Sequence, residues 1–388
     1  MGWSSHQQTG LTFRDPEQSA PGYTLVTPMF GDGSYLVDGD GLIVHRWQFE
    51  DFDAGYAKLL PSGNLLVRGT DRSVVVPDDV RLPMARDRAR HGAVREVDWD
   101  GNAVWEYEHH YVHHDMLRLD NGNTLMGRCV VLPEELARAV QGGRTLGGGR
   151  EGRGGSRGGE LMFGDEVIEV DPAGNEVWNT PLWQLLDPEQ DPICPVEGRH
   201  EWLHLNGIDL NADGDLLFSC RNPSRVGLVG RSTGELLWKF GAPNCHHQHH
   251  PTALPNGNVQ IFDNGAHMLA PSPVSRVIEV DPATDEIVWS YYGTPREQFF
   301  SGHISGAERL ADGHVLICEG TSGRIFEVTR SGDVVWEWHT PFRDDSPTGP
   351  TQQVFRAHRY APTFAGLAGR ALDTGAHRAQ NAALGLTP

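Results

Sequence analysis

The sequence predicts an all-β fold, a six-bladed β-propeller built from four-stranded blades. One motif is a tryptophan that closes a strand after a Gly- or Asp-containing turn, as in VDWDGNAVW and VDPAGNEVW, and it occurs six times. A second motif, a short hairpin such as RLDNGNTLM or ALPNGNVQI, alternates with the first. Each period of about 50 residues therefore holds two hairpins, and repetition of a four-stranded unit is typical of propellers.

The two motifs define the order of the elements. The outer hairpins end at Trp47, Trp105, Trp178, Trp238, Trp289 and Trp336, and the inner hairpins turn at Gly63, Gly122, Gly214, Gly257 and Gly313. Residues 35–47 form an outer hairpin with no inner hairpin before it, and residues 353–364 form an inner strand with no outer hairpin after it. We therefore expect the N- and C-terminal strands to pair in one blade and close the ring, which removes exposed sheet edges.

The segments outside the repeat define the domain organisation. The propeller is predicted over residues 21–364, after a flexible N-terminal arm at 1–20 and before a helical or loose C-terminal tail at 365–388. Residues 131–139 are predicted to form a short helix. Residues 140–160 are a Gly/Arg-rich insertion, predicted to be a flexible loop. A lid whose arginines meet an anion is the alternative interpretation of this insertion.

Composition limits the classes of partner. The net charge of −20 argues against nucleic acid and anionic membranes. The sequence has neither a basic N-terminal segment followed by an apolar core nor an apolar run long enough to cross a membrane. Its five cysteines are scattered without metal-ligand spacing, which favours reduced thiols in a cytoplasmic protein. The oligomeric state is left open.

Histidines recur at fixed distances before the inner-hairpin glycines. The positions eight and ten residues before these glycines, with Gly366 taken as the end of the last strand, include His114, His204, Asn206, His247, His249, His303, Arg356 and His358. Side chains two apart on a strand share a face, and the innermost strand of each propeller blade lines the central channel. We therefore expect these side chains to meet in one pocket. The alternative is that the histidines are unrelated and each has its own local partner.

The motifs resemble those of a known family, the arylsulfate sulfotransferases. The resemblance covers residues 21–360 and rests on HHDMLRLDNGNTLM, EWLHLNGIDLNADGDLLFSCR, QHHPTALPNGNVQIFDNG and GRIFEVTRSGDVVWEW. It implies a six-bladed propeller that moves a sulfuryl group from one phenol to another through a transient sulfohistidine. It implies no cofactor and no nucleotide donor (a PAPS-independent transferase), with a small aromatic or phenolic compound as the substrate.

The resemblance also assigns roles by motif. His249 matches the histidine that takes the sulfuryl group, and His114 and His204 match the assisting histidines. Asn206 and Arg221 match the residues that hold the sulfate. These residue types suit the reaction, because a neutral imidazole is a good nucleophile, a second imidazole can move the phenol proton, and arginine can hold sulfonate oxygens. Asp115 could orient a histidine, although strand alternation aims it at the other face.

Two features depart from the family. Secreted members carry a signal sequence and often a disulfide, and neither is evident here. The HHQHH cluster holds more histidines than sulfuryl transfer requires. His303, His358 and Arg356 are therefore added to Asn206 and Arg221 as candidate substrate-binding residues.

Two other functions remain open. A divalent transition metal bound by His114, His204, His249, His303 and His358 could support hydrolase, lyase or oxygenase chemistry. A propeller that binds a small molecule without catalysis is the second alternative.

Overall fold

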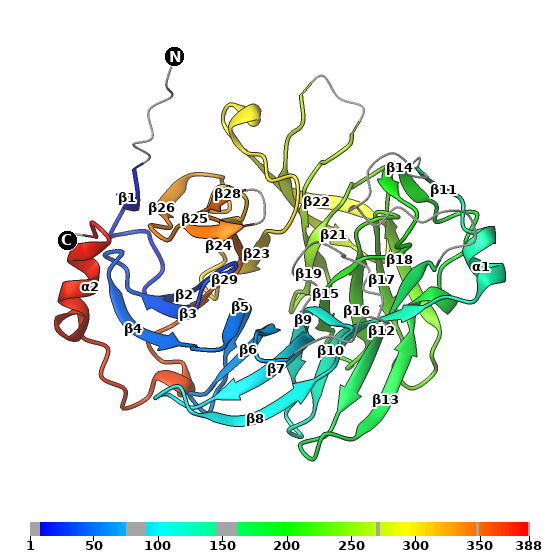
Figure 1. The fold of residues 1–388 in the computed structure, drawn as a ribbon. Coiled ribbons are helices and arrows are strands. Elements are labelled where there is room, and N and C mark those ends of the chain that lie inside the picture. Colours follow the sequence, from blue (N-terminus) through cyan, green and yellow to red (C-terminus); the bar gives the residue numbers. More distant parts are fainter. Residues whose placement is uncertain (1–7, 75–90, 145–160, 269–271, 347–348, 387–388) are drawn as a thin grey trace. The chain divides into compact units, whose positions relative to one another are not determined.

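The computed structural model describes residues 8–74, 91–144, 161–268, 272–346 and 349–386. Within these residues the chain is mainly antiparallel sheet, and six of its sheets have four or five strands (Figure 1). These sheets are the blades of an all-β, six-bladed propeller, so the predicted fold class is confirmed. The chain divides into unit 1, residues 1–67, 96–104 and 304–388, and unit 2, residues 68–95 and 105–303.

One sheet of unit 1 combines strands from both ends of the chain. Its order is β29-β2-β3-β4, with strands at Val354–Tyr360, Tyr23–Pro28, Gly33–Val37 and Ile43–Gln48. Strand β2 pairs antiparallel with β29, with Leu25 opposite His358. The first and last blade strands therefore lie in one sheet, and closure of the whole ring stays a prediction.

The other sheet of unit 1 has five strands and corrects the expectation for the N-terminal arm. Its order is β1-β26-β25-β24-β23, with strands at Gly10–Arg14, Val334–His339, Arg324–Val328, Val315–Glu319 and Gly306–Arg309. Residues 10–14 were expected to be flexible, but they pair with β26, and Thr12 Oγ1 donates to Glu337 Oε1 over 2.7 Å. The physical reason is that the outer edge of β26 offers backbone groups that need partners.

Three sheets belong to unit 2, and one more is divided between the units. The three are β13-β12-β10-β9 (Glu176–Pro181, Phe163–Val170, Thr124–Val131, Val112–Arg118), β15-β16-β17-β18 (Leu205–Leu210, Leu216–Cys220, Arg225–Val229, Leu236–Gly241) and β19-β20-β21-β22 (His249–Ala253, Val259–Asp263, Arg276–Asp281, Glu286–Tyr292). The divided sheet is β5-β6-β7-β8 (Phe52–Leu59, Leu65–Asp71, His91–Val97, Ala103–Glu108).

The remaining elements are short. Helix α1, Glu134–Ala139, lies where a short helix was predicted. In the insertion, β11 (Gly142–Arg144) pairs in parallel with β14 (Ile193–Gly198), and residues 145–160 lie outside the described residues. The others are η1 (Leu182–Gln184), η2 (Arg296–Gln298), β27 (Asp344–Ser346), β28 (Gly349–Thr351), η3 (Ala365–Leu367), η4 (Thr374–His377) and α2 (Arg378–Ala383), and the last three give the tail helical turns. Among the described residues, no helix has the length and apolar composition needed to cross a membrane.

The outer turns show why the repeated Asp-x-x-Gly pattern forms a hairpin. Asp98 Oδ1 accepts hydrogen bonds from the backbone N–H groups of Asp100 and Asn102, over 3.0 and 2.8 Å. Gly101 between them has φ 90°, a left-handed conformation that glycine adopts without a steric penalty. Asp171 makes the two equivalent bonds in the β12–β13 turn of unit 2, so one local rule builds both outer hairpins.

The repeated tryptophans link neighbouring blades. Trp336, in the fourth blade strand β26, is 1% exposed, and its Nε1–H donates to the carbonyl oxygen of Gly39 in the β3–β4 turn over 3.0 Å. Trp238 in β18 donates in the same way to Asp285 Oδ1 in the β21–β22 turn over 2.8 Å. Trp289, by contrast, is only half-buried. At Trp336 and Trp238, the tryptophan of the repeat motif therefore also makes a hydrogen bond that joins one blade to the next.

We expect Trp336→Ala to destabilise the protein strongly. The substitution removes a buried indole and leaves the Gly39 carbonyl without its donor, which should lower the free energy of unfolding by about 3–5 kcal/mol. Urea unfolding followed by circular dichroism measures this loss. Trp289→Ala is the matched control and should cost less, because its ring is half-buried. Equal losses for the two variants would contradict the proposed role of burial.

Candidate functional site

Three inner strands of unit 2 carry the predicted catalytic histidines. His114 lies in β9, His249 begins β19, and His204 directly precedes β15. Strand β15 contacts both β9 and β19, so the three strands lie side by side (Figure 1). The histidines therefore come from three neighbouring blades.

The backbone at these histidines departs from a regular strand. The φ angles of His114, His204 and His247 are 54°, 57° and 54°, in the left-handed region that non-glycine residues rarely adopt. The pairing of β9 with β10 shifts between Met126 and Gly127, and β15 and β19 show similar shifts. A bulge changes the direction of the side chains around it. The two-residue alternation therefore does not by itself determine the side-chain directions at this end of the strands.

The ring of His249 is held in one tautomer. His249 is 2% exposed, and its Nδ1 lies 2.7 Å from Asn264 Oδ1 and 3.1 Å from the carbonyl oxygen of His247. Asn264 Nδ2 donates to the carbonyl of Ser301 over 2.7 Å, which turns Oδ1 toward the histidine. Both neighbours of Nδ1 are acceptors, so Nδ1 carries the proton and the lone pair of the neutral ring is on Nε2.

A second chain of hydrogen bonds holds His114. His113 Nε2 donates to Asp165 Oδ1 over 2.9 Å, and His113 Nδ1 lies 2.6 Å from His114 Nδ1. When the His113 ring is neutral, its Nδ1 is the acceptor and His114 Nδ1 is the donor. Burial lowers the pKa of His114 well below 6.5, and the neighbouring His204 and His113 lower it further. His114 is therefore a neutral imidazole whose Nε2 can accept a proton.

His204 has the opposite electrostatic environment. Its Nδ1 lies 2.8 Å from Oε2 of Glu201, a carboxylate that is 3% exposed. Burial disfavours the charged ring, but the attraction of Glu201 outweighs burial and raises the pKa of His204 above 6.5. In the same pair, burial raises the pKa of the Glu201 carboxyl, but the attraction of His204 is stronger. The net effect lowers that pKa. One histidine of the site is therefore biased toward the charged form and another toward the neutral form.

Two of the three predicted catalytic histidines, His114 and His204, are in contact, and His249 acts electrostatically on His114. The ring centroids of His114 and His204 are 4.7 Å apart, in an edge-on arrangement of 69°. His249 is close enough to His114 to depress its pKa, as is Arg68. The group therefore combines three imidazoles with different properties. His249 has a fixed tautomer, His114 has a lowered pKa and His204 has a raised pKa.

Two of the predicted polar residues make mainly structural contacts. Asn206 is fully buried, and its Nδ2 donates to the carbonyl of Gln248 over 2.8 Å. Asp115 Oδ1 accepts from the backbone N–H of Met116 and its Oδ2 from that of Ile208, so Asp115 holds the backbone of β9 and β15. These bonds join strands of neighbouring blades.

Arg221 and His247 lie beside the group. Arg221 Nη1 donates to Glu197 Oε1 over 2.7 Å, and its backbone N–H donates to the carbonyl of His204. Arg221 acts electrostatically on His204. Burial first, and then Arg221 and His267, lower the pKa of His247 to about 2. The guanidinium is therefore next to the histidines, as its predicted role in binding an anion requires.

The three other predicted residues, His303, Arg356 and His358, are described within their own units. His303 is exposed at the end of unit 2. His358 and Arg356 belong to unit 1, where His358 Nε2 lies 2.6 Å from the Tyr56 hydroxyl and the Arg356 guanidinium lies 5.2 Å from the Tyr56 ring centroid. The role of these three residues in substrate binding stays a prediction.

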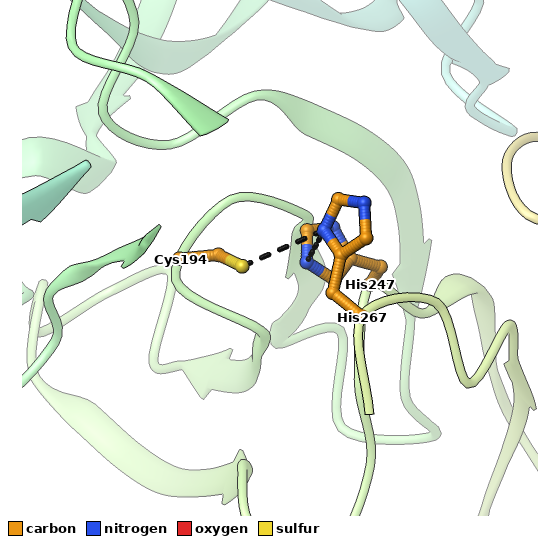
Figure 2. A group of neighbouring side chains, drawn as sticks. All are labelled: Cys194, His247 and His267. Atoms are coloured by element: carbon orange, nitrogen blue, oxygen red, sulfur yellow. Dashed lines mark hydrogen bonds between the residues drawn. The ribbon is translucent and has the colours of Figure 1, made fainter. Parts of the chain in front are cut away.

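Close sets of metal-ligating atoms occur elsewhere in unit 2. Among the described residues, no set whose donor atoms lie within 4.8 Å of one another combines the histidines predicted as metal ligands, which are His114, His204, His249, His303 and His358. One such set is Cys194, His247 and His267, drawn in Figure 2. His113, Cys129 and Asp165 form another set, and in it the Asp165 carboxylate already accepts from both other side chains.

The residues that orient the histidines were missed in the sequence. Glu201 and Asn264 stood within the motifs already singled out, three residues before His204 and fifteen after His249. Asp165 is 52 residues from His113 along the chain and had no local signal. For Glu201 and Asn264, a polar residue inside a recognised motif is the signal that could have indicated them, whereas the burial of all three side chains is visible only in the structure.

We expect Glu201→Gln to lower the pKa of His204 below 6.5, because burial and Arg221 then act without the opposing carboxylate. In the wild type, the raised pKa contributes stability that is fully present below pH 6.5 and is lost as the pH rises through the folded-state pKa. The destabilisation of the variant should therefore be larger below pH 6.5 than well above it. NMR titration of the histidine Cε1–H signals, with urea unfolding at several pH values, measures both effects.

Glu176→Gln is the matched control, since Glu176 pairs with Arg128 on β10. It should leave the titration of His204 unchanged. A pKa of His204 that stays above 6.5 in the Glu201 variant would show that the carboxylate does not hold the proton.

Comparison with known proteins identifies one family whose sequence model matches part of the chain. The sequence model of the arylsulfotransferase (ASST) family matches residues 155–341, which include His204, Arg221 and His249. Among curated proteins, the dehydrogenase subunit of the quinone alcohol dehydrogenase of Gluconobacter oxydans (strain 621H) is 27% identical over 183 residues, 41% of this chain and 22% of the relative. The chain thus spans about a fifth of the length of that relative.

Two solved structures match the chain, and the first of them supports its fold. A protein of unknown function from Bacteroides caccae has a TM-score of 0.54 at 14% identity and covers 88% of this chain and 99% of its own. A catalytically inactive virginiamycin B lyase from Staphylococcus aureus, solved with quinupristin, has a TM-score of 0.43 at 13% identity, covering 81% and 85%. At 14% identity, the similarity to the Bacteroides caccae protein supports the fold and says nothing of the function. The match over residues 155–341 supports the family that the sequence motifs suggested, and with it an arylsulfotransferase-like group-transfer enzyme.

Proposed function

We propose that this protein transfers a sulfuryl group between phenolic compounds, with Nε2 of His249 as the atom that carries the group. The observation that carries the proposal is the pair of acceptors around Nδ1 of His249, Asn264 Oδ1 at 2.7 Å and the His247 carbonyl at 3.1 Å. They keep the proton on Nδ1, so the nucleophilic lone pair is on Nε2 without prior deprotonation.

In the first half-reaction, Nε2 of His249 attacks the sulfur of an aryl sulfate. The N–S bond forms, the S–O bond to the aryl group breaks, and the leaving aryl oxide takes a proton from the His114–His204 pair. The pair can supply this proton because Glu201 biases His204 toward the charged form. Charge that develops on the sulfonate oxygens is stabilised by the nearby Arg221 guanidinium.

In the second half-reaction, an acceptor phenol takes the group. The neutral His114 accepts the phenol proton, the phenol oxygen attacks sulfur, and the N–S bond breaks. The proton returns to the His114–His204 pair, so protons balance over the cycle. The neutral form of His114 suits this step, because burial holds its pKa well below 6.5.

The test is to trap the sulfohistidine. Metal-stripped protein incubated with an aryl sulfate, without an acceptor, should gain the mass of one sulfuryl group, and peptide mapping should place it on His249. Addition of a phenol should remove the group and yield the new aryl sulfate. No mass gain, together with activity lost to a chelator, would instead favour a metal-dependent hydrolase, lyase or oxygenase.

The non-catalytic alternative has its own signature. A propeller that only binds a small phenol would retain full binding, and show no turnover, when both His114 and His249 are replaced by alanine. The transferase proposal expects turnover in the wild type and none in this double variant. Isothermal titration with a phenol, run beside the transfer assay, separates the two.

A further inference from the structure

A cysteine and two histidines of unit 2 converge beside the His114–His204–His249 group. Cys194 comes from β14, His247 from the segment before β19, and His267 from the segment after β20 (Figure 2). Nδ1 of His267 lies 3.2 Å from Nε2 of His247 and 3.5 Å from Sγ of Cys194. We propose that Cys194, His247 and His267 bind a zinc ion.

The distances fit a tetrahedral zinc site. Zinc lies about 2.0–2.1 Å from imidazole nitrogen and about 2.3 Å from thiolate sulfur, so two nitrogens on one ion are about 3.3 Å apart and a sulfur–nitrogen pair about 3.6 Å. The observed 3.2 Å and 3.5 Å edges agree with these values. Three protein ligands leave the fourth position for water.

The ligand types select the ion. Thiolate and imidazole are ligands for zinc and for the softer transition metals, whereas magnesium and calcium require oxygen ligands. Each of the three side chains also comes from a different segment, so one ion would hold three separate parts of unit 2 together. This contribution to folding is a known property of zinc sites.

The backbone at two of the ligands is strained. His247 and His267 have φ angles of 54° and 62°, in the left-handed region. Such conformations are unfavourable for non-glycine residues and persist where the surrounding structure or a ligand compensates. Both strained residues point a ring nitrogen at the same place, which is the arrangement that a shared ion stabilises.

Glu197 and Arg221 lie where they can orient the proposed ligand His247. Nδ1 of His247 is buried and makes no hydrogen bond within the described part of the chain, and the Glu197 carboxylate oxygen Oε1 lies 3.7 Å away. Zinc on Nε2 leaves the proton on Nδ1, facing this carboxylate, which is the usual outer partner of a zinc-bound histidine. Arg221 Nη1 donates to the same oxygen over 2.7 Å and holds it in place.

The site is connected to the proposed nucleophile. The carbonyl oxygen of His247 is one of the two acceptors around Nδ1 of His249. An ion on the His247 ring would therefore stabilise a segment that contacts the nucleophile. Asn264 Oδ1 holds the same tautomer of His249 without the ion, so the zinc has a structural role and the metal-stripped protein is still expected to form the sulfuryl adduct.

Metal binding by the full-length chain tests the proposal. Chelator-stripped protein titrated with zinc should bind one ion per chain, and the cobalt(II)-loaded protein should show the thiolate-to-cobalt charge-transfer absorption of a tetrahedral site. Cys194→Ser should abolish that absorption. Glu197→Gln should weaken zinc binding by about 10–100-fold, and His267→Gln by more, because it removes a ligand rather than an outer partner.

Two controls separate the site from the rest of the molecule. His246→Ala removes the neighbouring histidine of the same HHQHH stretch, and Cys318→Ala removes a core thiol of unit 1. Both should bind zinc like the wild type, with folding of every variant checked by circular dichroism. The proposal is overturned if the wild type binds zinc no more tightly than the His267 variant, or if the charge-transfer band survives in Cys194→Ser.

Discussion

Replacement of His249 by glutamine should lower sulfuryl transfer by at least about 10⁴-fold, because the variant lacks the nitrogen that forms the covalent intermediate. Other groups of the site remain in place, but none of them offers an alternative covalent path. The measurement is kcat with an aryl sulfate donor and a phenol acceptor, together with the intact mass of the protein after incubation with the donor alone. The variant should show no sulfuryl adduct.

Glutamine is chosen over alanine because His249 is buried. Alanine would leave Asn264 Oδ1 without its hydrogen-bond donor, at a cost of about 1–3 kcal/mol, and would confuse loss of stability with loss of chemistry. His246→Ala is the matched control and should retain full activity. A His249 variant with normal turnover, or a wild-type adduct mapped to a different histidine, would refute the assignment of the nucleophile.

Replacement of His114 by alanine should have an effect that depends on the leaving group. With phenyl sulfate, whose leaving phenolate is strongly basic, we expect kcat/KM to fall by about 10²–10⁴-fold, the usual contribution of a positioned acid or base. With 4-nitrophenyl sulfate as donor, the leaving group needs little protonation, so the first half-reaction should lose less than about 10-fold. Single-turnover formation of the adduct isolates this step.

The control for His114 is His110→Ala, a histidine on the turn before β9. It should leave both donors unaffected. Equal losses for the two donors in the His114 variant would mean that His114 positions the substrate and does not move the proton. A plot of log rate against the pKa of the leaving phenol would then have the same slope in the variant and the wild type.

The folding pattern was predictable because it repeats locally. The tryptophan-ended outer hairpins and the glycine turns of the inner hairpins depend on short-range rules, such as the Asp98 side chain that bonds the backbone of its own turn. The grouping of His114, His204 and His249 followed from their equivalent places in successive blades. The pairing of β1 with β26 was not predictable, since residues 10–14 meet an edge more than 300 residues away.

The amino-acid sequence alone determined the blade repeat, the family motifs and which three inner strands bring histidines together. Only the tertiary structure decided where the rings point and how each is protonated. The reason is that the register shifts beside His114 in β9 and between Leu205 and Gly207 in β15 interrupt the two-residue alternation from which side-chain facing is counted. The partners that set the tautomer or charge, Asn264, Asp165 and Glu201, act through contacts made only when the strands are packed.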